Sequence, residues 1–341
     1  MKFFFITRAH SPLADEKSRI LEQTRQALLK RPDVVEVLGP HEADVLLIQE
    51  AFSYKDFRYI DVLLSDPLLS QHLAKVFTLN FDDCATGLLR GLYANIPRSR
   101  LQPGLHAAVP YTDYFNEQVF LPTPGVTAPA YLATWRGNSS SNHLRPRLVA
   151  ALQHQADCKI ELTNSWLNHS PDEKKEYVQL LLNGKFSLCP VGLAHSSFRI
   201  YESMALGRCP VIIADDYAPP PGPDWAAFAL FYPESELAGL HQFLQQHEAT
   251  FAQRGQRAWQ AWNAFFRAGI LHDYYAAALM QLVAASAGFS VPTEIKRWRS
   301  TSFYWSNNWT LTQRVANRLA RYWRQLKPSG KPPKTNALAK P

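Results

Sequence analysis

Residues 185–217 constrain the fold more than any other stretch of this sequence, because they combine two buried strands with a helix. Phe186–Cys189 and Val211–Ile213 are short, continuous apolar runs, which predict buried strands. Between them, a pair of serines starts a helix and Gly207 ends it, since hydroxyls cap free N–H groups and glycine adopts the left-handed conformation without steric cost. The stretch is therefore predicted to be a βαβ unit, which implies a parallel sheet.

Four polar residues of this unit lie where such units bind phosphate groups: Ser196, Ser197, Arg199 and Glu202. The serines stand at the positive end of the helix dipole, and Arg199 offers a planar, charged fork suited to a diphosphate. Glu202 lies on the same helix face and can accept hydrogen bonds from ribose hydroxyls. The spacing leaves a second interpretation open, in which Arg199 and Glu202 form an ordinary ion pair on the helix surface.

The longer string around these residues resembles the core of the exostosin family of glycosyltransferases. The resemblance covers roughly Phe186–Glu236 and rests on Ser-Phe-Arg-Ile-Tyr-Glu-Ser-Met-Ala-Leu-Gly, Pro-Val-Ile, the acidic pair Asp215-Asp216 and a downstream Asp-Trp, in that order. It implies an α/β fold of the GT-B type, in which two Rossmann-like domains face a central cleft. It also implies that the second domain binds a nucleoside-diphosphate sugar, with uridine diphosphate as the expected carrier.

We expect the diphosphate to be bound without a metal ion or other cofactor. No Asp-x-Asp motif occurs, and Asp215-Asp216 ends a strand within the exostosin-like string, so this pair is not expected to be a metal site. Arg199 and the helix dipole are expected to neutralise the diphosphate instead. The sequence also lacks a dinucleotide-binding glycine motif, a P-loop, His-Glu-x-x-His and Gly-x-Ser-x-Gly.

The length of 341 residues favours two domains, and the segment from Pro122 to Pro129, with three prolines and a glycine, has the composition of a linker. We predict an acceptor domain over residues 1–125, a nucleotide-sugar domain over 130–286, and a basic aromatic tail over 287–341 that is partly helical with a disordered end. The predicted strands of the first domain are Phe3–Thr7, Val34–Leu38, Asp44–Ile48 and Lys75–Leu79, and its predicted helices are Asp15–Lys30, Ile60–Leu73 and Ala85–Tyr93.

An inverting transfer needs a general base that takes the proton of the acceptor hydroxyl. Our candidates are Asp83 and His10, because both follow predicted strands of the first domain and would line a cleft between the domains. The simpler alternative for Asp82 or Asp83 is that one of them caps the helix expected to start near Ala85.

Two further arginines precede the central unit. Arg136 follows the predicted strand Ala130–Trp135, and Arg145 matches the Arg-x-x-Leu element of the exostosin pattern together with Leu148. Both arginines are candidates for diphosphate binding, and the alternative is that they belong to a basic surface loop.

The positive charge of the chain belongs to its tail. Residues 291–341 hold eleven Lys and Arg and one acidic residue, whereas the rest of the chain has 25 basic and 28 acidic residues. The segment 309–326 has helical spacing with an aromatic and leucine face between arginines, so we expect either contact with an anionic membrane surface or packing on the first domain. The acidic balance of the body offers no basic groove, which disfavours a nucleic-acid partner.

The four cysteines, at positions 84, 158, 189 and 209, have no metal-ligand spacing and are expected to be buried free thiols of a reducing compartment. No apolar stretch approaches the length of about 18 residues that a membrane span needs. We therefore expect a cytoplasmic protein, with peripheral attachment to the inner face of the cell membrane as the variant that the tail suggests.

Taken with the resemblance, these features predict an inverting, metal-independent glycosyltransferase that moves a sugar from a nucleoside-diphosphate sugar to a hydroxyl of a glycan or lipid-linked acceptor. The alternative is a nucleotide-sugar-binding protein without catalytic activity, which the unidentified base keeps open.

Overall fold

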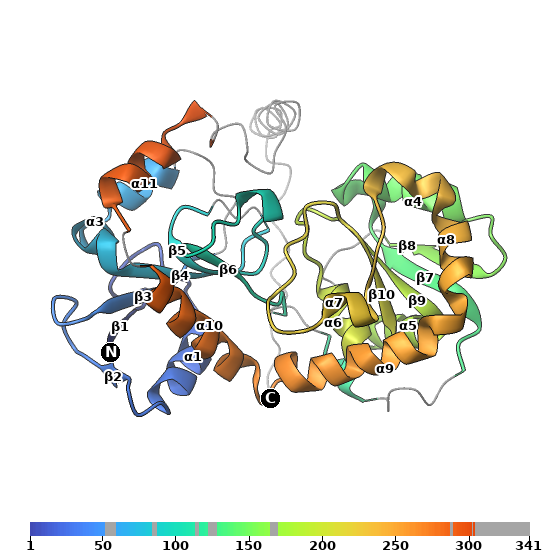
Figure 1. Ribbon diagram of the computed structural model, residues 1–341, viewed down its shortest axis with the longest axis horizontal. Coiled ribbons are helices and arrows are strands. Elements are labelled where there is room, and N and C mark those ends of the chain that lie inside the picture. Colours follow the sequence, from blue (N-terminus) through green and yellow to red (C-terminus); the bar gives the residue numbers. More distant parts are fainter. Residues whose placement is uncertain are drawn as a thin grey trace, which may run out of the picture.

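Two parallel β-sheets, one in each lobe, form the framework of the protein (Figure 1). The structure is a computed structural model, and it describes residues 1–51, 59–83, 87–112, 116–121, 128–163, 170–286, 289–301 and 303. The predicted tail segment 309–326 and Cys84 lie outside them.

In the described residues, the first sheet has the strand order β2-β1-β3-β4-β5-β6, and every neighbouring pair is parallel. Its strands are β1 (Lys2–Ile6), β2 (Val35–Glu36), β3 (Val45–Gln49), β4 (Val76–Asn80), β5 (Arg90–Tyr93) and β6 (His106–Ala108). The second sheet has the order β11-β10-β9-β7-β8, again parallel throughout. Its strands are β7 (Tyr131–Gly137), β8 (Cys158–Leu162), β9 (Gly184–Pro190), β10 (Cys209–Ile213) and β11 (Leu230–Phe231).

Helices cover both sheets, as buried parallel sheets require. The α-helices are α1 (Arg19–Leu29), α2 (Tyr59–Ser65), α3 (Pro67–His72), α4 (Leu144–Leu152), α5 (Pro171–Leu182), α6 (Phe198–Ala205), α7 (Trp225–Phe228), α8 (Leu240–His247), α9 (Phe251–Ala261), α10 (Leu271–Ala285) and α11 (Val291–Trp298). The shorter helical segments are η1 (Leu73–Lys75), η2 (Arg98–Arg100), η3 (Glu117–Phe120), η4 (Ser139–Ser141), η5 (Glu234–Gly239), η6 (Glu248–Thr250) and η7 (Trp262–Phe266). The two parallel α/β units confirm the α/β fold of the GT-B type.

Strand β1 shows how the first sheet is buried on both faces. Its side chains alternate, so that Phe3 and Phe5 join the hydrophobic core on the α1 side, and Phe4 and Ile6 join the core on the side of α2 and α3. A strand that is apolar at both alternating positions must be covered on both faces, which the surrounding helices achieve.

The chain returns to the first lobe after it has completed the second. Helix α10 packs against α1, β5 and β6, and the hydroxyl of Tyr275 donates a hydrogen bond to the carbonyl of Pro110 at 3.1 Å. Farther along, Trp298 of α11 is 1% exposed and belongs to the same core as Phe4 and Leu46. In Figure 1, α10 and α11 accordingly lie in the lobe that contains the N-terminus. Helix α10, at the end of the segment predicted as the second domain, and α11, in the predicted tail, therefore contribute to the core of the first lobe.

A short hydrogen-bonded contact joins the lobes near the carboxyl end of β10. The carboxylate of Asp216 accepts hydrogen bonds from the backbone N–H of Ser99, at 2.8 Å, and from its hydroxyl, at 2.5 Å. The guanidinium of Arg98 donates to the carbonyl of Asp215 at 2.8 Å. Beside this contact lies a pocket of about 380 Å³ whose lining includes Arg98, Tyr217 and Phe231. The acidic pair therefore holds the two lobes together.

One predicted element of the first lobe is wrong, and another is helical but divided into two helices. The segment Ala85–Tyr93 was expected to be helical, but its described part ends in the buried strand β5. The cause is a close approach to the neighbouring strand, since a Cβ on Gly91 would lie 2.0 Å from the carbonyl oxygen of Thr78. The expected helix Ile60–Leu73 is divided at Asp66, whose side chain caps α3 by accepting from the N–H of Leu69 at 2.9 Å.

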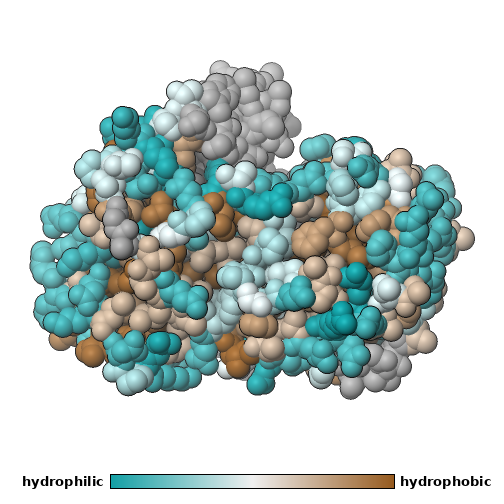
Figure 2. Space-filling model, viewed as in Figure 1, coloured by the Kyte–Doolittle hydropathy of each residue, from teal (hydrophilic) through white to brown (hydrophobic). Residues whose placement is uncertain are grey.

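Cys158, Cys189 and Cys209 are buried free thiols, as predicted. Within the described part of the chain, no helix combines the length and the apolar character needed to cross a membrane. On the face shown in Figure 2, hydrophilic residues cover much of the outer rim of both lobes.

If α11 completes the core of the first lobe, replacing Trp298 by alanine should lower the free energy of unfolding by about 3–5 kcal/mol, because a fully buried indole is lost. Trp259, which is 40% exposed on α9, supplies a matched control. Urea denaturation should show a clearly smaller loss for Trp259→Ala than for Trp298→Ala. Equal losses would mean that α11 does not form part of the core.

Candidate functional site

Helix α6 lies between β9 and β10 in the chain, and its amino end stands at the carboxyl edge of the second sheet. The side chain of Ser197 caps the helix by accepting a hydrogen bond from the backbone N–H of Arg199 at 3.3 Å. Gly207 follows the helix with a φ of +65°, a conformation that favours glycine. The sequence predicted both ends of this helix, and ligands of open α/β sheets bind at this edge.

Arg199 and Glu202 are buried, with exposed fractions of 9% and 2%, so they do not form an ion pair on the helix surface. The hydroxyl of Tyr177, from α5, connects them. It accepts from Nε of Arg199 at 3.1 Å and donates to Oε2 of Glu202 at 2.6 Å. Burial raises the pKa of Glu202, although the hydrogen bond from Tyr177 and the charge of Arg199 oppose this rise. The Tyr177 bridge therefore sets the relative position of the two predicted binding residues.

Arg145 lies near Arg199, because both guanidinium groups approach the ring of Trp135. The guanidinium carbons of Arg145 and Arg199 are 5.9 Å and 5.8 Å from the ring centre of Trp135, which is fully buried on β7. Arg145 donates to the carbonyl oxygens of Val191, at 3.2 Å, and Asn138, at 2.9 Å, and among the described residues it has no carboxylate partner. These contacts hold two guanidinium groups close to one indole.

The pKa of Arg145 is lowered to about 10 by burial and by the charge of Arg199. Arg145 therefore remains charged near neutral pH, and the two cations repel each other. Burial by itself lowers the pKa of Arg199. The interactions of Arg199 with Tyr177, Cys189 and Glu202 outweigh this effect, so the pKa is raised. One buried and one half-buried cation with a deficit of negative charge favour the binding of an anion.

The remaining predicted binding residues occupy different surroundings. Ser196 is 7% exposed and directly precedes the N-cap of α6. The side chain of Arg136 is instead engaged by the carboxylates of Glu161, at 3.7 Å, and Glu176, at 3.4 Å. The backbone carbonyl of Arg136, not its guanidinium, contacts Arg199.

Tyr111 connects Asp83 of the first lobe to the start of α6. Oδ1 of Asp83 accepts a hydrogen bond from the hydroxyl of Tyr111 at 3.1 Å, and the ring of Tyr111 packs against Phe198 with 5.4 Å between ring centres. Burial raises the pKa of Asp83, and the hydrogen bond from Tyr111 partly opposes the rise. No helix occurs in the described residues 87–93, so the helix expected over Ala85–Tyr93 is not found there.

His10 is placed differently from Asp83. It is exposed beyond the carboxyl end of β1, where its Nδ1 accepts from the backbone N–H of Thr7 at 3.1 Å. Strand β3 lies between β1 and β4, the strand that Asp83 follows. The structure therefore links Asp83 to α6 and shows no such link for His10 among the described residues.

Sequence reasoning did not single out Trp135, Tyr177 or His195. His195 lies in the loop before α6, where burial lowers its pKa while the carboxylates of Asp216, Glu234 and Asp215 act in the opposite direction. The position of His195 directly before the serine pair was a usable signal. Trp135 was predicted only as the end of the strand Ala130–Trp135, and the roles of Trp135 and Tyr177 arise from tertiary contacts.

Residues 81–247 match the sequence profile of the Exostosin GT47 domain. The resemblance to the exostosin family is confirmed over this segment, which is just under half of the chain. Every candidate described above except His10 lies inside the matched segment. The family match therefore covers the α6 unit, the two arginines over Trp135, and Asp83.

Individual relatives match over shorter stretches. Ribitol-5-phosphate xylosyltransferase 1 of Danio rerio is 31% identical over 86 residues, which cover 24% of this chain and 20% of that protein. The probable glucuronosyltransferase GUT1 of Oryza sativa subsp. japonica is 34% identical over 83 residues, which cover 24% of this chain and 20% of that protein. The chain thus spans about a fifth of the length of these curated relatives. The crystal structure of Acinetobacter baumannii MurG aligns with a TM-score of 0.35 and 12% identity, over 77% of this chain and 78% of that chain.

The bridging role of Tyr177 can be tested by its replacement with phenylalanine, which removes only the hydroxyl. Buried Glu202 would lose its hydrogen-bond donor, so we expect the free energy of unfolding to fall by about 1–3 kcal/mol. Tyr131→Phe on β7 is the control, because no side-chain hydrogen bond of Tyr131 is found in the described structure. Similar unfolding midpoints in urea for the two variants would contradict the bridge.

Proposed function

We propose that this chain is a glycosyltransferase that moves a sugar from a nucleoside-diphosphate sugar, with uridine diphosphate as the carrier, to a hydroxyl of a glycan or lipid-linked acceptor. The observation that carries this proposal is the pair of guanidinium groups near Trp135 at the amino end of α6, that of half-buried Arg145 and that of buried Arg199. Two converging cations at a helix amino end suit the two phosphates of a diphosphate. The exostosin family match over the same residues supports the assignment.

In the proposed reaction, the acceptor oxygen attacks the anomeric carbon while the bond from that carbon to the diphosphate breaks. The leaving diphosphate takes the bonding electrons, and Arg145 and Arg199 stabilise its growing negative charge. Glu202 is assigned to the ribose hydroxyls, because its free lone pairs can accept hydrogen bonds. Attack from the face opposite to the leaving group inverts the anomeric centre.

Asp83 is the base that we assign to the acceptor hydroxyl. Its burial raises its pKa, which makes the carboxylate a better proton acceptor than an exposed aspartate. Its contact with Tyr111, and the packing of Tyr111 on α6, support this choice over His10. The relatives are named as a xylosyltransferase and a glucuronosyltransferase, so we propose a pentosyl or hexosyl group as the transferred sugar.

Donor binding gives the first test, with uridine-, guanosine- and thymidine-diphosphate sugars compared by thermal shift and titration. We expect Arg145→Met to weaken donor binding by roughly 10- to 150-fold, the equivalent of about 1.5–3 kcal/mol for a hydrogen bond to a charged group. Arg199→Ala should abolish transfer. Arg147→Met is the matched control, because Arg147 is exposed on the same helix. Donor affinity that is equal in Arg145→Met and Arg147→Met would refute the assignment.

The pH dependence of kcat/KM tests the base. Asp83 must be deprotonated to accept a proton, so activity should fall as the pH drops through its raised pKa. Tyr111→Phe removes the hydrogen bond that lowers this pKa, and the acidic limb should therefore move to higher pH. Asp83→Asn should abolish transfer but retain donor binding. An acidic limb at the same pH in wild type and Tyr111→Phe would exclude Asp83 as the titrating base.

If donor binding occurs but neither donor hydrolysis nor transfer is found over a panel of acceptors, the chain is a nucleotide-sugar-binding protein without catalytic activity. That outcome would support Arg145 and Arg199 as donor-binding residues and would exclude Asp83 as a catalytic base.

A further inference from the structure

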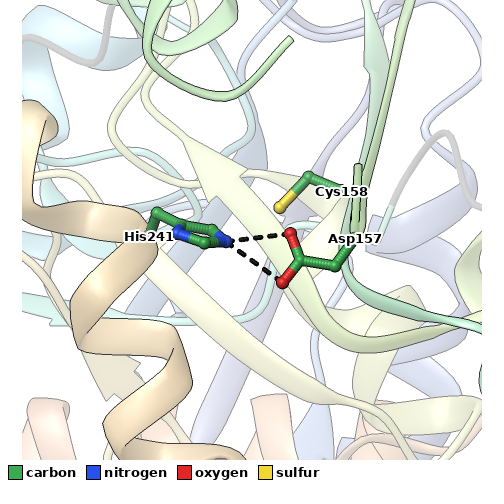
Figure 3. Close-up of side chains that lie close together, drawn as sticks. All are labelled: Asp157, Cys158 and His241. Carbon is green, nitrogen blue, oxygen red and sulfur yellow. Dashed lines mark hydrogen bonds and ion pairs between the residues drawn. The ribbon is translucent and has the colours of Figure 1, made fainter. Parts of the chain in front are cut away.

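Asp157, Cys158 and His241 form a cluster of potential metal ligands that the proposed transfer does not use (Figure 3). Asp157 directly precedes β8, Cys158 is the first residue of β8, and His241 is the second residue of α8. One ligand atom from each side chain lies within 4.8 Å of the others. No other group of three such residues is found in the part of the chain that the structure describes.

The geometry of the cluster brings three kinds of donor atom to one point. Nε2 of His241 lies 2.8 Å and 3.1 Å from the two carboxylate oxygens of Asp157. Figure 3 shows the sulfur of Cys158 beside the same carboxylate. Imidazole nitrogen, thiolate sulfur and carboxylate oxygen are the protein ligands that Zn²⁺ uses, and hard cations such as Mg²⁺ and Ca²⁺ do not select thiolate.

The backbone around the cluster is fixed independently of any ion. The carbonyl of Asp157 accepts from the N–H of Leu132 at 2.7 Å, and Cys158 pairs with Ala133 of β7 in the sheet. Helix α8 is anchored by Leu240, next to His241 in the chain, which is fully buried. The ligands therefore sit on packed elements, as a preformed metal site requires.

The cluster is closed on one side and open on the other. Cys158 is 9% exposed, whereas the side chains of His241 and Asp157 are 21% and 43% exposed. An ion can therefore enter from solvent and keep a water molecule as its fourth ligand. Burial and the nearby Asp157 carboxylate raise the pKa of the Cys158 thiol to about 12, so the group is protonated until a cation replaces the proton.

The cluster is separate from the proposed transfer site. It lies at the amino end of β8, whereas Arg136 and Gly137 mark the carboxyl end of the parallel neighbour β7, at the edge where α6 begins. A ligand bound at Asp157 therefore has no direct contact with the residues assigned to the diphosphate.

We propose that Asp157, Cys158 and His241 bind one Zn²⁺ ion, with water as the fourth ligand. Binding replaces the thiol proton of Cys158, which is released to solvent, and it converts the hydrogen-bonded Asp157–His241 contact into two metal–ligand bonds. The ion joins α8 to the start of β8 and thereby ties two elements of the second lobe together.

Zinc binding is measured by calorimetric titration of the chelator-treated full chain with zinc chloride. We expect one zinc ion per chain in the wild type. Cys158→Ser and His241→Gln should each weaken binding by at least about tenfold, since even the loss of a residue that only supports a metal ligand costs about 10–100-fold. His247→Gln, on the same helix and outside the cluster, is the control and should bind zinc like the wild type.

Cobalt(II) identifies the ligands directly, because thiolate coordination gives a sulfur-to-metal charge-transfer absorption. This band should appear in the wild type and in His247→Gln and disappear in Cys158→Ser, with circular dichroism confirming that each variant is folded. The proposal is overturned if the full chain shows no saturable one-to-one zinc binding. It is also overturned if Cys158→Ser keeps both the zinc affinity and the charge-transfer band.

Discussion

The arrangement of the second lobe depends on how two like charges are held against one indole ring. Arg145 and Arg199 are kept near Trp135 by backbone carbonyls and by the Tyr177 hydroxyl, and Glu202 is a buried counter-charge beside Arg199. Holding two cations together where both are partly or fully removed from water is unfavourable, and the fold tolerates this because carbonyl groups accept hydrogen bonds from the guanidinium groups. A diphosphate would replace repulsion by attraction at this point, which makes the unfavourable arrangement useful for binding.

The first lobe contacts the elements around this site through a small number of residues. Tyr111 links Asp83 to the first turn of α6, and Asp216 fixes the loop around Ser99 to the carboxyl end of β10. The acidic pair of the exostosin-like string thus has a structural explanation, because Asp216 is occupied by hydrogen bonds from the other lobe. The same contacts determine how far the lobes can separate while Asp83 stays connected to α6.

The predictable and unpredictable parts of this structure differ in the range of the interactions that determine them. The α6 unit was predictable because serine caps, Gly207 and apolar runs act over a few residues. Strand β5 was not predictable from its own sequence. The need for glycine at position 91 comes from the close approach of the neighbouring backbone at Thr78. Likewise, the sequence named Arg145 and Arg199 but not Trp135, and spacing gave no hint that Cys158 would meet His241. Contacts between distant segments decide such roles, and one sequence does not contain a periodic signal for them.

The return of α10 and α11 to the first lobe has a consequence for synthesis on the ribosome. Residues 1–112 emerge first, yet their core lacks Leu279 and Trp298 until most of the chain has been made. The sheet of the second lobe, from Tyr131 to Phe231, has no such requirement and can form earlier. The lobes would then complete in the reverse of the order in which they are translated, and the waiting half-covered sheet is where chaperones would bind the nascent chain.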